Sequence, residues 1–340
     1  MSKKVLVTGG AGFVGSNLVD RLLSNGEQVI VYDNLFRPGV EHNIDWLKSN
    51  WQDKFEFVKE DVCNAEKIQE AAKDVDAIYH TAGQTAVTTS VSNPRQDFEI
   101  NALGTFNVLE AARKSEKDPV VIYTSTNKVY GDLEDVKIAE REKRYEFEEL
   151  VNGVPSERPI EPHTPYGCSK ATGDSYCLDY NRIYGLKTVV FRMSCIYGTR
   201  QFGCIDQGWV AHFITSYINK NPLTIFGDGK QIRDVLFVDD LVNAFIAATE
   251  NIDKTAGQPY AIGGGAKNTM SLIELVKYIE ERGNRPFDLS YDEWRPSDQK
   301  VYYSDVSKAK KDFGWEPKID PKEGVNLLYS WIEKNKELFK

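Results

Sequence analysis

The chain has 340 residues, of which 41% are hydrophobic and 27% charged, and its formal net charge is −9. This length accommodates one large domain or two smaller ones, and the composition is typical of a soluble globular protein. The negative charge argues against non-specific binding to nucleic acid or an anionic membrane. No apolar run approaches the roughly 20 residues of a membrane-spanning helix. We therefore expect neither nucleic acid nor a membrane as partner.

The cysteines indicate the compartment. They form no Cys-x-x-Cys pair and show no spacing with histidine that suggests a zinc site, so we expect no metal and reduced thiols, as in the cytoplasm. The first residues, MSKKVLVTGG, enter a strand at once, so no signal peptide is expected. The five cysteines are Cys63, Cys168, Cys177, Cys195 and Cys204.

Short β-branched segments alternate with helical patterns in the first half of the chain. Their alternation predicts an α/β fold, a Rossmann-type doubly wound parallel sheet covered by helices on both faces. In such a fold, ligands bind beyond the carboxyl ends of the strands. Strands are expected at 5–7, 28–32, 55–58, 77–80, 120–123 and 188–191, and helices near 14–25, 64–73, 97–115 and 166–184.

After about residue 193 this rhythm breaks, and only two further helices are clear, near 238–250 and 271–283. We expect an NAD-binding Rossmann domain over 1–193 and a smaller C-terminal α/β substrate-binding region over 194–340, with an approximate boundary and segments that can interleave. The segment 132–164 stands apart because it is acidic and rich in proline. A solvated surface insertion is the simpler interpretation, and a lid over the site is the alternative.

A glycine-rich turn, Gly9-x-x-Gly12-x-x-Gly15, lies between the first strand and the first helix. Glycines let the backbone turn tightly and approach a pyrophosphate, whose charge is met by the helix N-terminus. Asp33 ends the second strand, where a carboxylate binds the ribose hydroxyls and repels a 2′-phosphate, so NAD is favoured over NADP. Arg37 leaves NADP open, because an arginine near this position can accommodate that phosphate.

Tyr166 and Lys170 are four residues apart, hence one helical turn apart on one face. A tyrosine ionises near pH 10, and a neighbouring ammonium together with a positive nicotinamide lowers its pKa towards the working range of a base. Thr124-Ser125-Thr126, at a strand end, supplies a hydroxyl to steady the reacting group. With the glycine-rich turn, this set predicts hydride transfer between a nicotinamide and a carbinol.

The strings TGGAGFVG, YTSTNKVYG and YGCSK, with the late arginines, resemble the extended short-chain dehydrogenase/reductase family that modifies nucleotide sugars. The resemblance covers essentially the whole chain. It implies Tyr166 as base, Lys170 as its tuner and ribose contact, and Thr126, or alternatively Ser125, as the hydroxyl that binds the reacting oxygen. Motif and resemblance together give the expected NAD-binding residues: Gly9, Gly12, Phe13, Val14, Gly15, Asp33, Asn34, Arg37, Asp61, Val62, Thr81, Ala82, Gly83, Gln84, Asn101, Thr124, Tyr166, Lys170 and Met193.

The residues after the strand-end hydroxyl bear on the reaction. Sugar 4,6-dehydratases of the family resemble one another in carrying an Asp-Glu pair there, and decarboxylating relatives carry a glutamate. This chain has Asn127-Lys128 instead. With no second acid–base pair, oxidation followed by return of the same hydride is the simplest chemistry left, which is that of an epimerase. A purely structural role for Asn127 and Lys128 is the alternative to a direct role for Lys128.

Five further strings, GQTAVTTSVSNP, STNKVYGDL, YGCSKATGDSYCLDYNRIYGLKTVVFR, RQFGCIDQGWV and GDGKQIRDVL, resemble the branch of the family that acts at C2 of CDP-paratose and CDP-tyvelose. The resemblance implies a CDP-linked hexose as substrate, CDP-glucose included, bound NAD that ends each turnover as it began, and a homodimer or homotetramer. The alternatives are a C4 epimerase, a net nucleotide-sugar oxidoreductase and a non-catalytic nucleotide-sugar-binding protein.

The resemblance also implies a substrate site in which Arg233 and Arg295 clamp the diphosphate, because the guanidinium fork meets phosphate oxygens bidentately. Ion pairs with Asp234 or Asp298 are the alternative. Cys195 aligns with a substrate-binding asparagine of some 4-epimerases, yet a buried cysteine is usually a small apolar filler. The full expected set is Gln84, Thr85, Thr88, Ser90, Ser194, Cys195, Arg200, Gln201, Gln207, Arg233 and Arg295. Trp209 is expected to pack in the core, and a contact near the nucleotide is the alternative.

Overall fold

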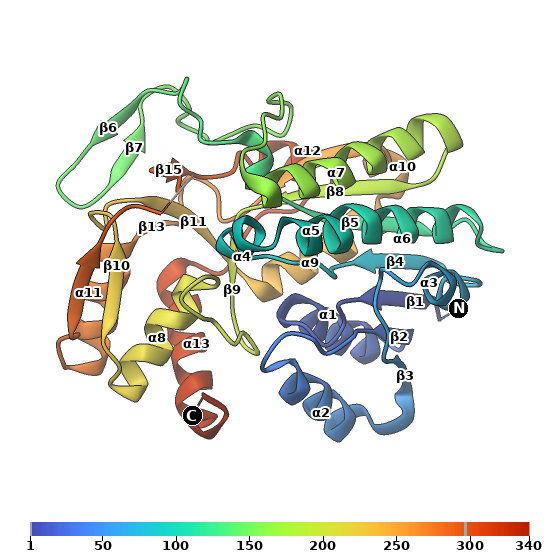
Figure 1. The fold of residues 1–340 in the computed structure, drawn as a ribbon, viewed down its shortest axis with the longest axis horizontal. Coiled ribbons are helices and arrows are strands. Elements are labelled where there is room, and N and C mark those ends of the chain that lie inside the picture. Colours follow the sequence, from blue (N-terminus) through green and yellow to red (C-terminus); the bar gives the residue numbers. More distant parts are fainter. Residues whose placement is uncertain (1, 296–297, 340) are drawn as a thin grey trace.

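A seven-stranded parallel sheet forms the centre of the computed structural model, which describes residues 2–295 and 298–339 (Figure 1). The strand order is β12-β8-β5-β4-β1-β2-β3, and every pairing is parallel. The strands are β1 (Lys4–Thr8), β2 (Gln28–Tyr32), β3 (Phe55–Val58), β4 (Ala77–His80), β5 (Val120–Thr126), β8 (Thr188–Met193) and β12 (Gln258–Ile262).

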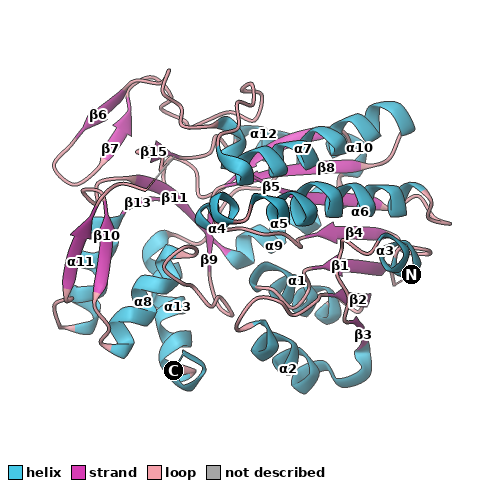
Figure 2. Ribbon diagram, in the orientation of Figure 1, coloured by secondary structure: helices cyan, strands magenta, loops and turns pink. Residues whose placement is uncertain are grey.

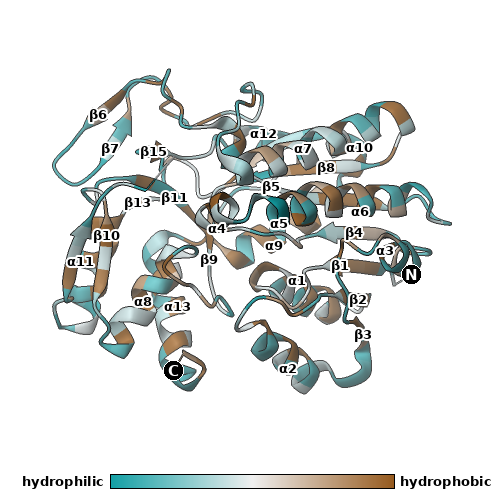
Figure 3. Cartoon of the chain, viewed as in Figure 1, coloured by the Kyte–Doolittle hydropathy of each residue, from teal (hydrophilic) through white to brown (hydrophobic). Residues whose placement is uncertain are grey.

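Helices cover both faces of this sheet (Figure 2). Alternate residues of β1 enter different clusters, Val5 and Val7 on one face of the sheet and Leu6 on the other. This explains why β1 is hydrophobic along most of its length (Figure 3). One face packs against α1 (Phe13–Ser24), α2 (Val40–Trp51), α9 (Val238–Glu250) and α12 (Ser307–Phe313), and the other against α3 (Ala65–Ala71), α6 (Gly104–Arg113) and α7 (Thr164–Tyr184). The predicted doubly wound α/β fold is confirmed.

The strand order reverses between β1 and β4, so the loops that follow these strands diverge and leave room for a ligand at the carboxyl edge of the sheet. The six strands expected from the sequence are present, whereas α2 and β12 were not anticipated. Because β12 pairs with β8, the sheet takes strands from both sides of residue 193. The division into 1–193 and 194–340 stays a prediction.

The remaining C-terminal segments build a second hydrophobic cluster beside the carboxyl edge of the sheet. Its central strand is β11, which pairs with β9, β13 and β15. These elements are β9 (Cys195–Tyr197), α8 (Trp209–Asn219), β10 (Leu223–Phe226), β11 (Ile232–Phe237), β13 (Thr269–Ser271), α11 (Leu272–Gly283), β14 (Leu289–Asp292), β15 (Val301–Tyr302) and α13 (Pro321–Lys334). The short helix α10 (Ile252–Thr255) packs instead with α9 and α12 on the central sheet. The short helices α4 (Val87–Ser92) and α5 (Pro94–Phe98) precede a π-helical turn, Glu99–Leu103.

The segment 132–164 is packed more firmly than a solvated insertion. It forms a hairpin of β6 (Ile138–Glu140) and β7 (Tyr145–Phe147), and its apolar side chains join a buried cluster with residues of β11 and β15. Arg144 pairs with Glu274 at the start of α11. The acidic composition conceals this packing, because the buried side chains are few and scattered along the segment.

Within residues 2–295 and 298–339, no helix is long and apolar enough to cross a bilayer, and no cluster of His, Cys, Asp and Glu side chains is suited to a metal ion.

A buried ion pair fastens α7 to the sheet. Arg192 on β8 donates from Nε and Nη2 to Asp174 on α7, both at 2.9 Å, and Ser125 Oγ donates to the same carboxylate at 2.8 Å. The Asp174 side chain is fully buried and that of Arg192 is 6% exposed.

We predict that Asp174→Ala lowers the free energy of unfolding by about 3–5 kcal/mol, because it leaves the buried Arg192 charge without its partner. Denaturant unfolding measures the change. The exposed pair between Lys67 and Glu70 supplies a control, and Glu70→Ala is expected to leave the unfolding midpoint unchanged. Equal midpoints for Asp174→Ala and the native chain would contradict the account.

Candidate active site

The glycine-rich turn leaves the N-terminus of α1 open to an anion. Gly9 has a φ of +67°, and its amide donates to Tyr32 O at 2.8 Å. Gly12 caps α1 without a side-chain hydrogen bond, so the N–H groups in the first turn of the helix stay available to bind an anion. A side chain at Gly15 would overlap the Gly9 carbonyl, so only glycine permits this close packing. These features fit the pyrophosphate of a dinucleotide.

Asp33 follows β2 at the edge of the same groove. Its two oxygens accept hydrogen bonds from Ala11 N at 3.0 Å and Leu35 N at 2.8 Å, which orient the carboxylate beside the glycine-rich turn. Arg37 points across the groove, where it donates to Thr85 Oγ1 at 2.8 Å and to Gln207 Oε1. This engagement of Arg37 favours NAD over a cofactor that carries a 2′-phosphate.

One hollow joins most of the residues predicted to bind the cofactor, and it also includes five residues predicted to bind substrate, of which Gln84 is in both sets. The cofactor set is Gly9, Gly12, Phe13, Val14, Gly15, Asp33, Asn34, Arg37, Asp61, Val62, Thr81, Ala82, Gly83 and Gln84, and the substrate set is Thr85, Arg200, Gln201 and Gln207, beside Gln84. The glycine turn, the helix N-terminus and the ribose-binding carboxylate therefore lie together, and the residues present fit NAD.

A second, adjoining hollow contains the catalytic candidates. Tyr166 and Lys170 line it from α7, and both are largely buried. Burial raises the pKa of Tyr166 to about 12; a hydrogen bond with Thr126 opposes this rise, and the charge of Asp97 adds to it. Burial lowers the pKa of Lys170 to about 8, and its Nζ lies 4.3 Å from the centre of the Tyr123 ring. Without further positive charge, Tyr166 is therefore a phenol, and its tuning by Lys170 stays a prediction.

The two candidate hydroxyls differ in their partners. Thr126 contacts the Tyr166 phenol and also donates to Asn127 Oδ1 at 3.3 Å, whereas Ser125 donates to Asp174 in the buried network behind the site. This geometry favours Thr126 as the group that assists Tyr166. Thr124 and Met193, both predicted to contact the cofactor, line the same hollow.

A buried carboxylate that the sequence analysis missed organises the loop after β4. Asp97 accepts hydrogen bonds from Ser169 Oγ at 2.5 Å, Gln84 Nε2 at 2.9 Å and Asn101 Nδ2 at 3.1 Å. Asn101, in the π-helical turn, accepts a hydrogen bond from Gln84 N at 3.0 Å, so it helps to position the loop after β4. In the sequence, Asp97 follows Pro-Arg-Gln and resembles an exposed helix residue, so no signal pointed to it.

The predicted diphosphate clamp lies at a third hollow, shared in part with the second. Arg233 pairs with Asp298 at 2.6 Å and lines both hollows. Arg295 donates to Ile205 O at 2.7 Å, and its guanidinium lies 3.9 Å from the centre of the Phe226 ring. The ion pair of Arg233 with Asp298, given above as the alternative, is thus present. The Arg233 guanidinium nevertheless borders the hollow, as the predicted diphosphate clamp requires.

Other substrate candidates divide into two groups. Thr88, Ser194 and Cys195 line the catalytic hollow, and Cys195 Sγ accepts a hydrogen bond from Trp209 Nε1 at 3.0 Å. Burial raises the pKa of Cys195 to about 12, so it is a neutral thiol. Ser90 is turned inward and donates to the backbone of its own helix.

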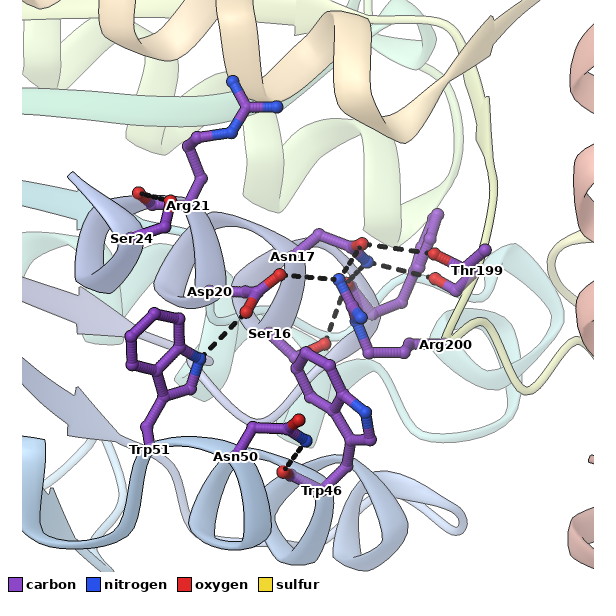
Figure 4. Close-up of polar contacts among 11 residues, drawn as sticks. Ser16, Asn17, Asp20, Arg21, Ser24, Trp46, Asn50, Trp51, Thr199 and Arg200 are labelled. Carbon is purple, nitrogen blue, oxygen red and sulfur yellow. Dashed lines mark hydrogen bonds and ion pairs between the residues drawn. The ribbon is translucent and has the colours of Figure 1, made fainter.

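Arg200 is held by the cofactor-binding helices (Figure 4). It donates to Asn17 Oδ1 at 2.5 Å, and its guanidinium lies 4.0 Å from the centre of the Trp46 ring. These contacts account for its charge, so a substrate role for Arg200 finds no support in this geometry.

The position that distinguishes dehydratases carries no carboxylate here. Asn127 Nδ2 donates to Gln299 Oε1 at 3.0 Å. Lys128 lines the catalytic hollow, and burial, with the nearby charge of Arg233, lowers its pKa to about 8. Tyr166 and Lys128 therefore both border the catalytic hollow, and a direct role for Lys128 stays a prediction.

The family model described as GDP-mannose 4,6 dehydratase matches residues 6–328. The chain belongs to this family of NAD-dependent nucleotide-sugar epimerases and dehydratases. It is 45% identical to CDP-paratose 2-epimerase of Salmonella typhi over 336 residues, which are 96% of this chain and 98% of that protein. It is 36% identical to the putative UDP-glucose 4-epimerase of Methanocaldococcus jannaschii over 338 residues, 97% of this chain and 99% of that protein.

Solved structures of nucleotide-sugar epimerases have a similar fold. UDP-glucuronic acid 4-epimerase from Bacillus cereus, in complex with UDP-glucuronic acid and NAD, superposes with a TM-score of 0.83 at 28% identity, covering 98% of this chain and 99% of that one. These findings confirm the predicted family, an NAD-dependent epimerase fold and NAD as the cofactor of the family.

We predict that Thr126→Val raises the pKa of Tyr166, because the hydrogen bond that favours the phenolate is lost. Since the base must be ionised, the rising limb of the pH–rate profile moves to higher pH, and kcat/KM near neutral pH falls by about 10–100-fold. The steady-state pH profile of epimerisation measures both effects.

Ser125→Ala is the matched control for this prediction. Its hydroxyl serves Asp174, so we expect lower stability and an unmoved pH profile. A shifted profile in Ser125→Ala with an unshifted one in Thr126→Val would exchange the two roles.

Proposed function

We propose that the protein is an NAD-containing epimerase that inverts C2 of a CDP-linked hexose, with CDP-paratose, CDP-tyvelose and CDP-glucose as candidate substrates. The similarity to the Salmonella typhi 2-epimerase over nearly the full length of both chains carries the substrate assignment. The site supports the reaction class, because it combines Tyr166 and Thr126 with an uncharged amide and a lysine where dehydration would need carboxylates.

In the proposed reaction, Tyr166 takes the proton of the C2 hydroxyl as phenolate while Thr126 bonds the same phenolic oxygen. Bound NAD supplies a hydride acceptor at C2 and a donor for the return. The product of the first half is a 2-ketone, and Tyr166, now a phenol, gives its proton back to the C2 oxygen when the opposite face of the sugar is reduced. Protons and electrons balance over the cycle without another reactant.

The sugar must turn between the two half-reactions while the nucleotide stays bound. Arg233 and Arg295 would hold the diphosphate at one side of the hollow. Small uncharged side chains, Thr88, Ser194 and Cys195, line the wall near Tyr166 and leave the sugar free to rotate.

A homodimer is part of the proposal, since apolar side chains are exposed along the outer face of α5 to α7: Phe98, Phe106, Tyr176, Ile183 and Tyr184. Such a face is typical of a protein–protein contact. Light scattering would give twice the mass of one chain, and a monomer at micromolar concentration would refute this part. All five cysteines are unpaired, which supports a cytoplasmic location.

The test uses NMR of the purified protein with CDP-paratose and CDP-glucose in deuterated water, with no added NAD. We expect inversion at C2 without deuterium at that carbon, because the hydride returns from bound cofactor rather than from solvent. Inversion at C4 would point to a 4-epimerase, and accumulation of a keto sugar that requires added NAD would point to a net oxidoreductase. Either of these two results would overturn the assignment.

A further inference from the structure

The Arg37 guanidinium connects three segments of the chain at the cofactor hollow. Arg37, between β2 and α2, donates from Nη1 to Thr85 Oγ1 at 2.8 Å and from Nη2 to Gln207 Oε1. Thr85 follows β4, and Gln207 lies in the loop between β9 and α8. All three line the cofactor hollow, so Arg37 joins its two walls. In the described part of the chain, Arg37 forms no ion pair with a carboxylate.

The base of the β9–α8 loop is fixed to the cofactor-binding elements. Arg200 bonds Asn17 of α1 and stacks on Trp46 of α2 (Figure 4). Asn43 Nδ2 donates both to Ala11 O in the glycine-rich turn, at 3.1 Å, and to Arg200 O, at 3.2 Å. The loop therefore starts from a rigid anchor beside the pyrophosphate-binding turn.

The tip of this loop is a closed turn between two glycines, Gly203 and Gly208. Cys204 N donates to Gln207 O at 2.9 Å, and Gln207 N donates to Cys204 O at 3.1 Å. Gly208 has a φ of +76°, a conformation that favours glycine and suits a pivot. Asp206 and Gln207 line all three hollows, so this tip stands between the cofactor and the nucleotide sugar.

We propose that Arg37, Thr85 and Gln207 form a clasp that retains the dinucleotide through turnover and opens for cofactor exchange. The assignment rests on the proposed function only in that a reaction which returns its own hydride needs a retained cofactor. Arg233 and Arg295 line hollows that do not include Arg37, so Arg37 itself lies outside the predicted diphosphate site, whereas Gln207 borders both.

The test measures how fast NADH leaves the full-length protein. The protein is loaded with NADH, an excess of NAD is added, and the loss of bound-NADH fluorescence is followed in time. Because a hydrogen bond from a charged donor corresponds to a tenfold or larger change in an equilibrium, we expect dissociation about tenfold faster in Arg37→Met and in Gln207→Ala. The double variant should be no faster than the faster single one, within about twofold, since both remove the same contact.

Arg95→Met is the matched control, because Arg95 is exposed and pairs with Glu99 one helical turn away. Its NADH dissociation rate should equal that of the native chain. Single variants within twofold of the native rate, or effects that multiply in the double variant, would overturn the clasp. If Arg37→Met fails to fold, Thr85→Val removes one of the two contacts and carries the same prediction. The measurement uses no sugar, so it is independent of the test of the proposed function. Unchanged NADH dissociation would refute the clasp even if the protein epimerises its substrate, and a protein that does not epimerise could still show the predicted dissociation rates.

Discussion

The burial of one phenol at the carboxyl edge of the sheet is the constraint on which the rest of the site depends. Tyr166 can act as a base only if its surroundings stabilise the phenolate, because burial and the charge of Asp97 raise its pKa to about 12 despite the hydrogen bond with Thr126. Thr126 supplies a hydrogen bond, and the positively charged oxidised nicotinamide expected beside it would supply charge. In the proposed reaction, ionisation of Tyr166 would therefore depend on the bound cofactor.

The surrounding structure holds that phenol rigidly. α7 is fastened to the sheet by the Arg192–Asp174 pair, and Ser169 on the same helix bonds Asp97. Asp97 in turn fixes the loop after β4, which lines both the cofactor and the catalytic hollows. A single buried network therefore sets the distance between base and cofactor, and this arrangement suits a reaction that must abstract and return a hydride in the same geometry.

The sequence revealed the parts of the fold and site that depend on local patterns. The β-branched strands, the glycine-rich turn and the Tyr166/Lys170 spacing follow from periods of two and four residues and from glycine geometry. Features formed by distant residues escaped prediction: β12 pairs with β8 across a long connection, and Asp97 resembles a solvent-exposed helix residue. Arg200 was predicted to contact the substrate, whereas it stacks on Trp46 of α2, a helix that was not anticipated.

The matching family model is described as a dehydratase, but family membership does not determine the reaction of this chain. Asn127 and Lys128 stand where dehydration would require carboxylates. The most direct measurement follows the hydrogen at C2 itself. CDP-paratose with deuterium at C2 is mixed with unlabelled CDP-glucose, and both products are analysed by mass spectrometry and NMR after epimerisation in ordinary water. The account predicts that each product molecule keeps the hydrogen isotope of its own substrate at C2. Transfer of deuterium between the two sugars, or its loss to water, would contradict hydride return within one closed site.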